Sequence, residues 1–242
     1  MQTGLYVALS ARLALERRME TIANNVANAG TAGFRADEIS FQSLMSRTGD
    51  KPVAFASPGD THITRRNGEI SKTGNPLDVA VSGDAWLGLQ TPAGPVYTRD
   101  GRMRLRESGV LESLNGYQVL DAGGAPITLD PNAGAPQISR DGMISQGDQQ
   151  IGALGLFTID PTAKLSRFDN SGVIPDKPVA PVVEFTANGV VQGSVEGSNV
   201  NPVLELTKMM MVQRTFESLS TMTESSESAL QDAIKTLGGT ST

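Results

Sequence analysis

A long stretch near the C-terminus, residues 202–237, constrains the fold most, because small and apolar residues recur there at steps of three and four. The positions are Met209, Val212, Phe216, Leu219, Thr223, Ser226, Leu230, Ala233 and Leu237. Such spacing places side chains on one stripe of an α-helix and is typical of a coiled-coil seam. Asn201-Pro202 suits a helix start and Gly238-Gly239 a helix stop. We predict one helix from about Pro202 to Leu237.

The N-terminus predicts a second amphipathic helix. Between Gly4 and Ala29 the chain has no proline and no internal glycine. Gly30 can adopt the left-handed conformation that ends a helix, so the helix should end near Asn28. Its apolar seam, interrupted only by Arg12, consists of Leu5, Ala8, Leu15, Met19, Ile22 and Val26. We expect residues 1–30 to pair with residues 200–242 as a coiled-coil-like assembly domain.

The middle of the chain predicts β structure. Glycine and proline punctuate residues 31–75, whose apolar positions follow no sustained period, so we expect an extended connector with a strand or two. Residues 76–199 contain short runs that alternate apolar and polar side chains, and turn dipeptides such as Asn67-Gly68 and Asn115-Gly116 occur nearby. We predict an antiparallel β domain there. The expected fold class is mainly β with long terminal α-helices.

Charge and composition exclude several function classes. The net charge of -6 gives nucleic acid and anionic membranes no attraction, and no stretch reaches membrane-spanning length. The chain has no cysteine, so disulfides, thiolate nucleophiles and cysteine-ligated zinc are excluded. The first residues lack the basic and apolar pattern of a cleaved secretory signal. If the protein is exported, we expect another route.

No pattern predicts a catalytic, cofactor or metal site. The single histidine, His62, lies in a turn-rich segment, and the scattered carboxylates show no calcium-loop spacing. Met209-Met210-Met211 could form an adaptable binding surface, although packing explains them better. Trp86 on a strand is more often a core residue than a sugar platform. Most of the acidic residues that could pair in a glycosidase lie near glycine-containing turns: Glu107, Glu112, Asp121, Asp141 and Asp148.

The two predicted helices favour assembly with other subunits. The C-terminal seam has few large apolar residues for its length, and one shorter helix offers too little apolar surface to offset the entropy lost on ordering it. We therefore expect both termini to be mobile in the isolated chain and to fold when many copies pack.

Four segments resemble the signatures of flagellar rod and hook axial proteins. The first runs from Asn24 to Arg35, where an Asn-apolar-Ala-Asn helix end leads into Thr-x-Gly-aromatic-basic. The second is Gly197–Pro202 followed by Gln213–Glu217, and residues 76–81 and 97–101 are similar to the segments that open the β domain in this family. The resemblance spans nearly the whole chain and is sparse in 37–66 and 130–190. Within the family, the short chain is similar to proximal rod members.

The resemblance implies a structural subunit of the bacterial flagellar rod that self-assembles and transmits torque, and not an enzyme. Implied partners are copies of itself, other rod and hook proteins and the flagellar type III export apparatus, without nucleic acid or membrane insertion. The implied location is the periplasmic rod of the basal body, reached without signal cleavage. Alternatives are a distal rod or hook-type subunit, or a secreted β-rich hydrolase or carbohydrate-binding module.

The expected subunit interface combines the two seams with polar residues that the resemblance names. Among these, Gln213 and Arg214 can bond across an interface, Arg through two parallel hydrogen bonds. The full set is Leu5, Leu15, Met19, Ile22, Asn25, Val26, Asn28, Met209, Val212, Gln213, Arg214, Phe216, Leu219, Leu230 and Leu237.

Overall fold

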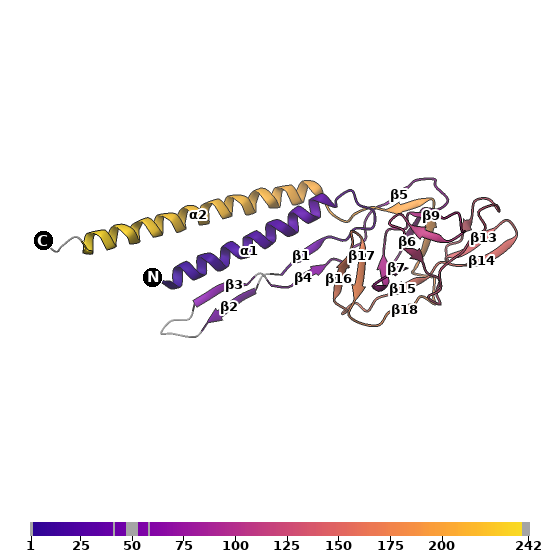
Figure 1. The fold of residues 1–242 in the computed structure, drawn as a ribbon, viewed down its shortest axis with the longest axis horizontal. Coiled ribbons are helices and arrows are strands. Elements are labelled where there is room, and N and C mark those ends of the chain that lie inside the picture. Colours follow the sequence, from indigo (N-terminus) through magenta and orange to yellow (C-terminus); the bar gives the residue numbers. More distant parts are fainter. Residues whose placement is uncertain (1, 41, 47–52, 58, 239–242) are drawn as a thin grey trace. The chain divides into compact units, whose positions relative to one another are not determined.

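The computed structural model describes residues 2–40, 42–46, 53–57 and 59–238, with side chains described for all of these except 2–5, 42–46, 53, 54, 56, 230, 237 and 238. The chain forms two compact units. The first comprises residues 1–26, 37–62 and 201–242, and the second comprises 27–36 and 63–200. The chain therefore passes between the units four times (Figure 1).

The elements follow one another in this order: α1 (Gln2–Ala27), β1 (Asp37–Ile39), β2 (Gln42–Ser46), β3 (Val53–Ser57), β4 (Thr61–Ile63), β5 (Ile70–Lys72), β6 (Val79–Ser82), β7 (Ala85–Thr91), β8 (Gly94–Thr98), β9 (Met103–Leu105), β10 (Leu111–Ser113), β11 (Gln118–Val119), β12 (Gln137–Ile138), β13 (Met143–Gln146), β14 (Gln149–Ala153), β15 (Leu156–Thr158), β16 (Leu165–Phe168), β17 (Gly172–Pro175), β18 (Ala180–Pro181), β19 (Gly189–Gln192), β20 (Ser194–Glu196) and α2 (Pro202–Gly238). The predicted connector thus holds β1 to β5, more strands than expected.

The start of α2 follows from local chemistry. Asn201 accepts a hydrogen bond from the amide of Leu204 through its Oδ1 atom at 3.1 Å, and from the amide of Glu205 through its carbonyl at 3.0 Å. These bonds satisfy amides that have no partner inside the helix, and Pro202 at the first helical position has no amide to satisfy. The predicted start at Pro202 is confirmed. The predicted helix end was Gly238-Gly239. Gly238 is the last residue of α2, and Gly239 lies outside the described residues.

The predicted fold class is wrong in its account of the helices. Most elements are strands, and only the C-terminal helix is long: α2 has 37 residues and α1 has 26. The two helices meet where Asn25 Nδ2 lies 3.4 Å from Glu205 Oε2 and where the Arg12 guanidinium lies 5.2 Å from the Phe216 ring centre. No coiled-coil seam joins them, because Ser226 and Ala233 on the predicted stripe are exposed.

The helices do not form a continuous coiled coil because they differ in length and because several side chains on the predicted stripe are small. The difference of 11 residues (37 − 26) corresponds to about 16 Å of helix, so the last turns of α2 have no part of α1 beside them. Figure 1 shows α2 continuing past the N-terminal end of α1. The later positions of the predicted stripe include Thr223, Ser226 and Ala233, which have little apolar surface to bury. Within the described residues, neither helix is apolar enough over a sufficient length to span a membrane.

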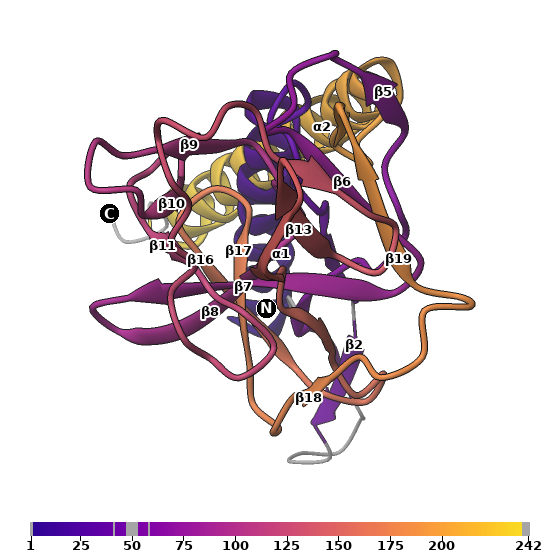
Figure 2. The same ribbon diagram turned by 90° about the vertical axis from the view of Figure 1, so that its right-hand side faces the viewer.

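The second unit is built from antiparallel ladders. Its largest sheet has the order β16-β17-β8-β7-β11-β10-β9, and β15 joins it by pairing with both β7 and β18. Figure 2 shows β7 running across this unit with β8 beside it, and their register includes Leu87 opposite Thr98. Smaller ladders are β12-β13-β14, β6-β19 and β5-β20. Hairpins such as the one at Asn115-Gly116, which joins β10 to β11, connect neighbouring strands.

The alternating side chains of these strands form one main core and a smaller one. The main core includes Leu87, Leu111 and Ile144, all nearly inaccessible to solvent. The smaller core gathers Trp86, Tyr97 and Phe157, and the rings of Tyr97 and Phe157 meet edge to face at 5.3 Å. The first unit contains the hairpin β2-β3, the pair β1-β4 and both helices.

Candidate subunit interface

The first three turns of α2 expose apolar side chains on one side of the helix. At about 100° per residue, these side chains occupy roughly one half of the helix surface. The opposite half carries Glu205 and Val212, both buried within the first unit. The exposed set, which we call the α2 outer face, consists of Val203, Leu204, Leu206, Met210 and Met211.

Helix α1 has a similar exposed stripe near its start. Tyr6, Leu9 and Leu13 are all more than half exposed, and their spacing of three and four residues places them on one face. Ile22 and Asn25, which are buried, lie on roughly the opposite side of the helix. We call Tyr6, Leu9 and Leu13 the α1 outer face.

These outer faces make the two helices apolar on two sides. One side packs within the chain, and the other presents large apolar side chains to solvent. A surface helix of a self-sufficient domain has a polar outer side, whereas a helix that is apolar all round is normally buried. Contiguous exposed apolar surface marks an interaction site. Exposed apolar side chains of this kind make the two outer faces the candidate interface.

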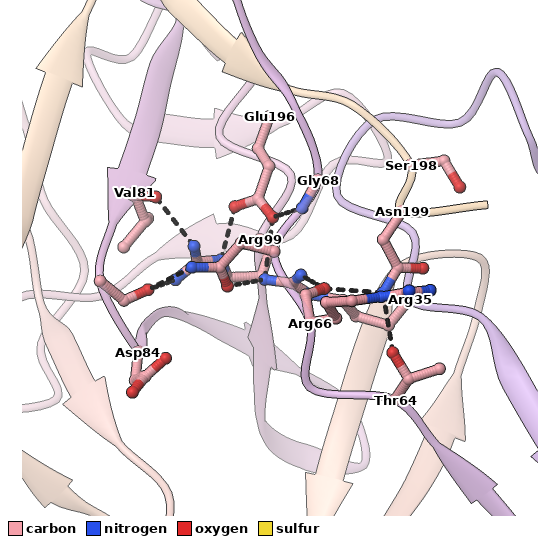
Figure 3. A network of polar contacts seen from close by, with 12 residues as sticks. Arg35, Thr64, Arg66, Gly68, Val81, Asp84, Arg99, Glu196, Ser198 and Asn199 are labelled. Atoms are coloured by element: carbon pink, nitrogen blue, oxygen red, sulfur yellow. Dashed lines mark hydrogen bonds and ion pairs between the residues drawn. The ribbon is translucent and has the colours of Figure 1, made fainter. Parts of the chain in front are cut away.

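A buried charge cluster lies in the second unit, where distant parts of the chain meet (Figure 3). The carboxylate of Glu196, 1% exposed, pairs with Arg35 at 2.8 Å and with Arg99 at 2.6 Å. The amide of Gly68 donates a third hydrogen bond to the same carboxylate at 2.8 Å. Each oxygen of Glu196 therefore has a charged donor.

The two guanidinium groups are held by backbone carbonyls as well. Arg99 donates to the carbonyls of Val81, Gly83 and Ala85, which belong to the segment from β6 into β7. Arg35 donates to the carbonyl of Arg66 and to Asn67 Oδ1. Both guanidinium groups lie near the indole ring of Trp86, with Cζ atoms 5.7 Å and 6.0 Å from the ring centre. These contacts fix five segments of the second unit to one another.

Burial acts against the charge of both arginines. Desolvation lowers the pKa of Arg35 to about 10, although Glu196 acts to raise it, and the positive charge of Arg99 lowers it further. Burial also lowers the pKa of Arg99, again opposed by Glu196. At neutral pH both arginines carry their charge, so the stability of the cluster depends on the Glu196 carboxylate.

Backbone pairing beside the cluster joins the segment that follows α1 to the segment that precedes α2. The amide of Gly33 donates to the carbonyl of Glu196 at 2.8 Å, and the amide of Asn199 donates to the carbonyl of Phe34 at 3.2 Å. Gly33 must be glycine, because its φ is 67° and a Cβ atom would lie 2.2 Å from the amide nitrogen of Asp100. Asn199 also accepts from the amide of Ala36.

Most of the predicted interface residues on α1 lie on the side of the helix that packs within the chain, and not on the α1 outer face. Asn25 is buried and exchanges hydrogen bonds with the backbone of Asp37, at 2.9 Å in each direction. Asn28 accepts a bond from the Thr31 hydroxyl at 3.2 Å. The side chain of Leu5 lies outside the described residues. The remaining predicted positions are buried or half-buried: Leu15, Met19, Ile22 and Val26.

On α2 the predicted set divides between the two sides. Gln213 and Arg214 are exposed, and Arg214 lies on the side of the α2 outer face, one turn beyond Met210 and Met211. The side chains of Leu230 and Leu237 lie outside the described residues. The other predicted positions are buried or half-buried: Met209, Val212, Phe216 and Leu219. As contacts to a partner, all the predicted residues stay predictions.

Sequence reasoning missed both the outer faces and the charge cluster. Leu9, Leu13 and Leu206 lie off the seam pattern, which selected one stripe per helix and ignored the other side. Arg99 and Glu196 are separated by 97 residues, so no local pattern pairs them. One available signal was the position of Glu196, directly before the Gly197–Pro202 signature.

Three family models match the chain. "Flagella basal body rod protein" matches residues 5–35, "Flagellar hook protein FlgE/F/G D1 domain" matches residues 80–146, and "Flagellar basal body rod FlgEFG protein C-terminal" matches residues 191–236. Arg35 lies in the first of these matches, Arg99 in the second and Glu196 in the third. The three members of the charge cluster thus fall in three separately matched regions.

Curated relatives are similar over the full chain. "Flagellar basal-body rod protein FlgF" of Mesorhizobium japonicum is 52% identical over 241 residues, which cover 100% of both chains. The FlgF protein of Rhizobium meliloti is 45% identical over 99% of both chains. That of Caulobacter vibrioides is 34% identical over 98% of this chain and 99% of the relative.

Glu196→Gln should destabilise the second unit by about 3–5 kcal/mol, because it leaves two buried guanidinium groups without a counter-charge. Glu112→Gln is the matched control: Glu112 is equally buried, but its partners Arg104 and Arg106 are more than half exposed and can rehydrate. The control should lose about 1 kcal/mol or less. Urea unfolding followed by the fluorescence of Trp86, the single tryptophan, measures both. Equal losses in the two variants would contradict the role of the cluster.

Proposed function

The chain belongs to the flagellar basal-body rod protein family and is a structural subunit of the bacterial flagellar rod, and we propose that it polymerises through the outer faces of α1 and α2 to transmit torque. The observation that carries the proposal is the exposed apolar surface on both helices. As a family member it is located in the basal body and assembles with other flagellar axial proteins.

The proposed position is the proximal rod. The three relatives described above all carry the name FlgF and are 52%, 45% and 34% identical to this chain, whereas relatives named FlgG align over similar lengths at 27–29% identity, which favours this position over a distal rod or hook-type subunit. The same full-length similarity favours a rod subunit over a secreted hydrolase or carbohydrate-binding module. The family is one of structural proteins, and we assign no catalytic residue.

The mechanism is geometric. One side of each terminal helix packs within its own subunit, so its outer face is free to bind a different subunit. Contacts between unlike surfaces that do not close into a ring generate a helical filament. In this proposal residues 1–30 and 200–242 carry the assembly contacts, and residues 76–199 set the spacing between subunits. Because each subunit contacts several neighbours, rotation applied at one end is transmitted along the axis.

The route to the rod is also proposed from the family. A rod subunit has to leave the cytoplasm before it assembles, and we propose that the flagellar type III export apparatus carries this chain without cleavage to the periplasmic part of the axis. Neither nucleic acid nor insertion into the membrane has a role in the proposal.

Leu206→Gln tests the α2 outer face. Leu206 is 47% exposed, so the substitution should change the free energy of unfolding by no more than about 0.5 kcal/mol, while incorporation into basal bodies and motility are lost. Leu114→Gln is a matched control, since Leu114 is also 47% exposed but lies between β10 and β11. The control should assemble normally. Normal assembly of Leu206→Gln would contradict the proposed contact.

Arg214→Glu tests the polar continuation of the same face. The substitution reverses an exposed charge next to the apolar stripe, so the monomer should fold with unchanged stability while rod assembly is impaired, because a partner carboxylate or carbonyl would then meet a negative charge. Arg214→Lys should retain part of the rod assembly, because lysine keeps the positive charge but cannot form two parallel hydrogen bonds to one carboxylate. Swimming in soft agar and immunoblots of purified basal bodies measure both variants. Full motility of Arg214→Glu would remove Arg214 from the interface.

A further inference from the structure

The outer faces of α1 and α2 carry exposed apolar side chains in matching patterns. Each face contains a stripe in which a step of three residues is followed by a step of four, so both stripes extend over about 10 Å of helix. All of these side chains are at least 47% exposed. They are Tyr6, Leu9 and Leu13 on α1, and Val203, Leu206 and Met210 on α2. Two stripes of equal length can lie against each other along their whole length.

The two stripes of one chain do not cover each other. The helices run antiparallel, with Asn25 next to Glu205 and Arg12 next to Phe216 (Figure 1). The second contact places Leu9 level with about residue 219 of α2. The centre of the α2 stripe, at residue 206, lies 13 residues from that level (219 − 206), which corresponds to about 20 Å of helix. Each stripe is therefore left for another molecule.

The charged residues within the two stripes do not oppose a contact between them. On α1 the only such residue is Arg12, whose guanidinium lies over the ring of Phe216 in its own chain. On α2 they are Glu205, which is buried, and Lys208, which pairs with Glu205 at 2.6 Å. Packing one stripe against the other therefore removes no unpaired charge from water, and such removal is the costly part of many interfaces.

We propose that the α1 outer face of one subunit packs against the α2 outer face of a second copy of this chain, shifted by about 20 Å along the helix axis. A shift along the axis keeps the two helices antiparallel. The facing pairs are then Tyr6 with Met210, Leu9 with Leu206 and Leu13 with Val203, and the first pair places a thioether against an aromatic ring, which is a favourable contact. The inference rests on the proposed function and adds the partner surface and its register.

A contact of this kind repeats. It joins unlike surfaces, so each subunit that uses its α1 outer face still has its α2 outer face to offer to the next copy, and the series does not close. Six half-exposed side chains bury much less than the roughly 1,200 Å² of total area that a stable interface needs. A single contact is therefore weak, and lasting assembly requires several contacts per subunit.

Disulfide cross-linking tests the register, because it traps weak contacts and the chain has no cysteine of its own. The full-length variant Leu9→Cys/Leu206→Cys is concentrated and oxidised with copper phenanthroline. The two cysteines of one chain are too far apart to join, since a disulfide needs Cα atoms within about 7 Å. We expect a ladder of cross-linked multimers on a non-reducing gel.

Leu9→Cys/Met222→Cys is the matched control. Met222 is also exposed on α2, at 71%, but it lies near the level of Leu9 in the unshifted register. The control should form multimers roughly tenfold more slowly, because the proposed shift keeps these two positions apart. Equally fast multimer formation in the two variants would overturn the register.

The single variant Leu206→Cys tests the choice of partner surface. If this variant forms a dimer as fast as the double variant forms multimers, α2 packs against α2 and the proposed pairing is wrong. The absence of any ladder in Leu9→Cys/Leu206→Cys would also overturn the pairing. Loss of assembly in Leu206→Gln would still support the proposed function in that case, so the two proposals can fail separately.

Discussion

A single carboxylate, that of Glu196, compensates two buried guanidinium groups, and the arrangement of the second unit depends on it. Arg35, Arg99 and Glu196 come from segments far apart in the sequence, and none of the three can be buried without the others. The ion cluster therefore selects one way of bringing these segments together. Hydrogen bonds from Gly33, Gly68 and Asn199 add to it and leave the local backbone little freedom.

This constraint bears on function because the cluster lies where the chain enters and leaves the second unit. Residues 27–36 and 63–66 and residues 196–200 are the parts of that unit next to the four crossings, and they are hydrogen-bonded to one another. The segments that continue into α1 and α2 are thus fixed at their bases. In the proposed function these segments carry force, and buried, charge-assisted bonds restrict their motion.

Local signals in the sequence predicted local features well. Asn201-Pro202 identified the start of α2, because capping depends only on neighbouring residues, and Asn115-Gly116 identified a hairpin for the same reason. Asn67-Gly68 has the same hairpin signature but lies between β4 and β5, which do not pair with each other. Its glycine is required because a Cβ atom would lie 2.0 Å from the carbonyl oxygen of Gly197, a residue distant in sequence. Long-range contacts of this kind, like the pairing of Arg99 with Glu196, leave no local pattern.

The coiled-coil prediction failed for a related reason. Helical spacing shows which residues share a face, but it does not show what covers that face. Val212 and Ala233 both belong to the predicted stripe, yet the first is buried and the second is exposed. The apolar residues of the α2 outer face fell outside the selected pattern, although their exposure is the observation on which the proposed contact rests.

The central claim is that neighbouring subunits cover the outer faces of α1 and α2. Because the chain has no cysteine, a single cysteine introduced as Leu206→Cys can be labelled selectively with a maleimide. The account predicts rapid labelling of the purified monomer and strong protection in isolated basal bodies, with Leu114→Cys labelled in both. Equal labelling of Leu206→Cys in the monomer and in basal bodies would contradict the account.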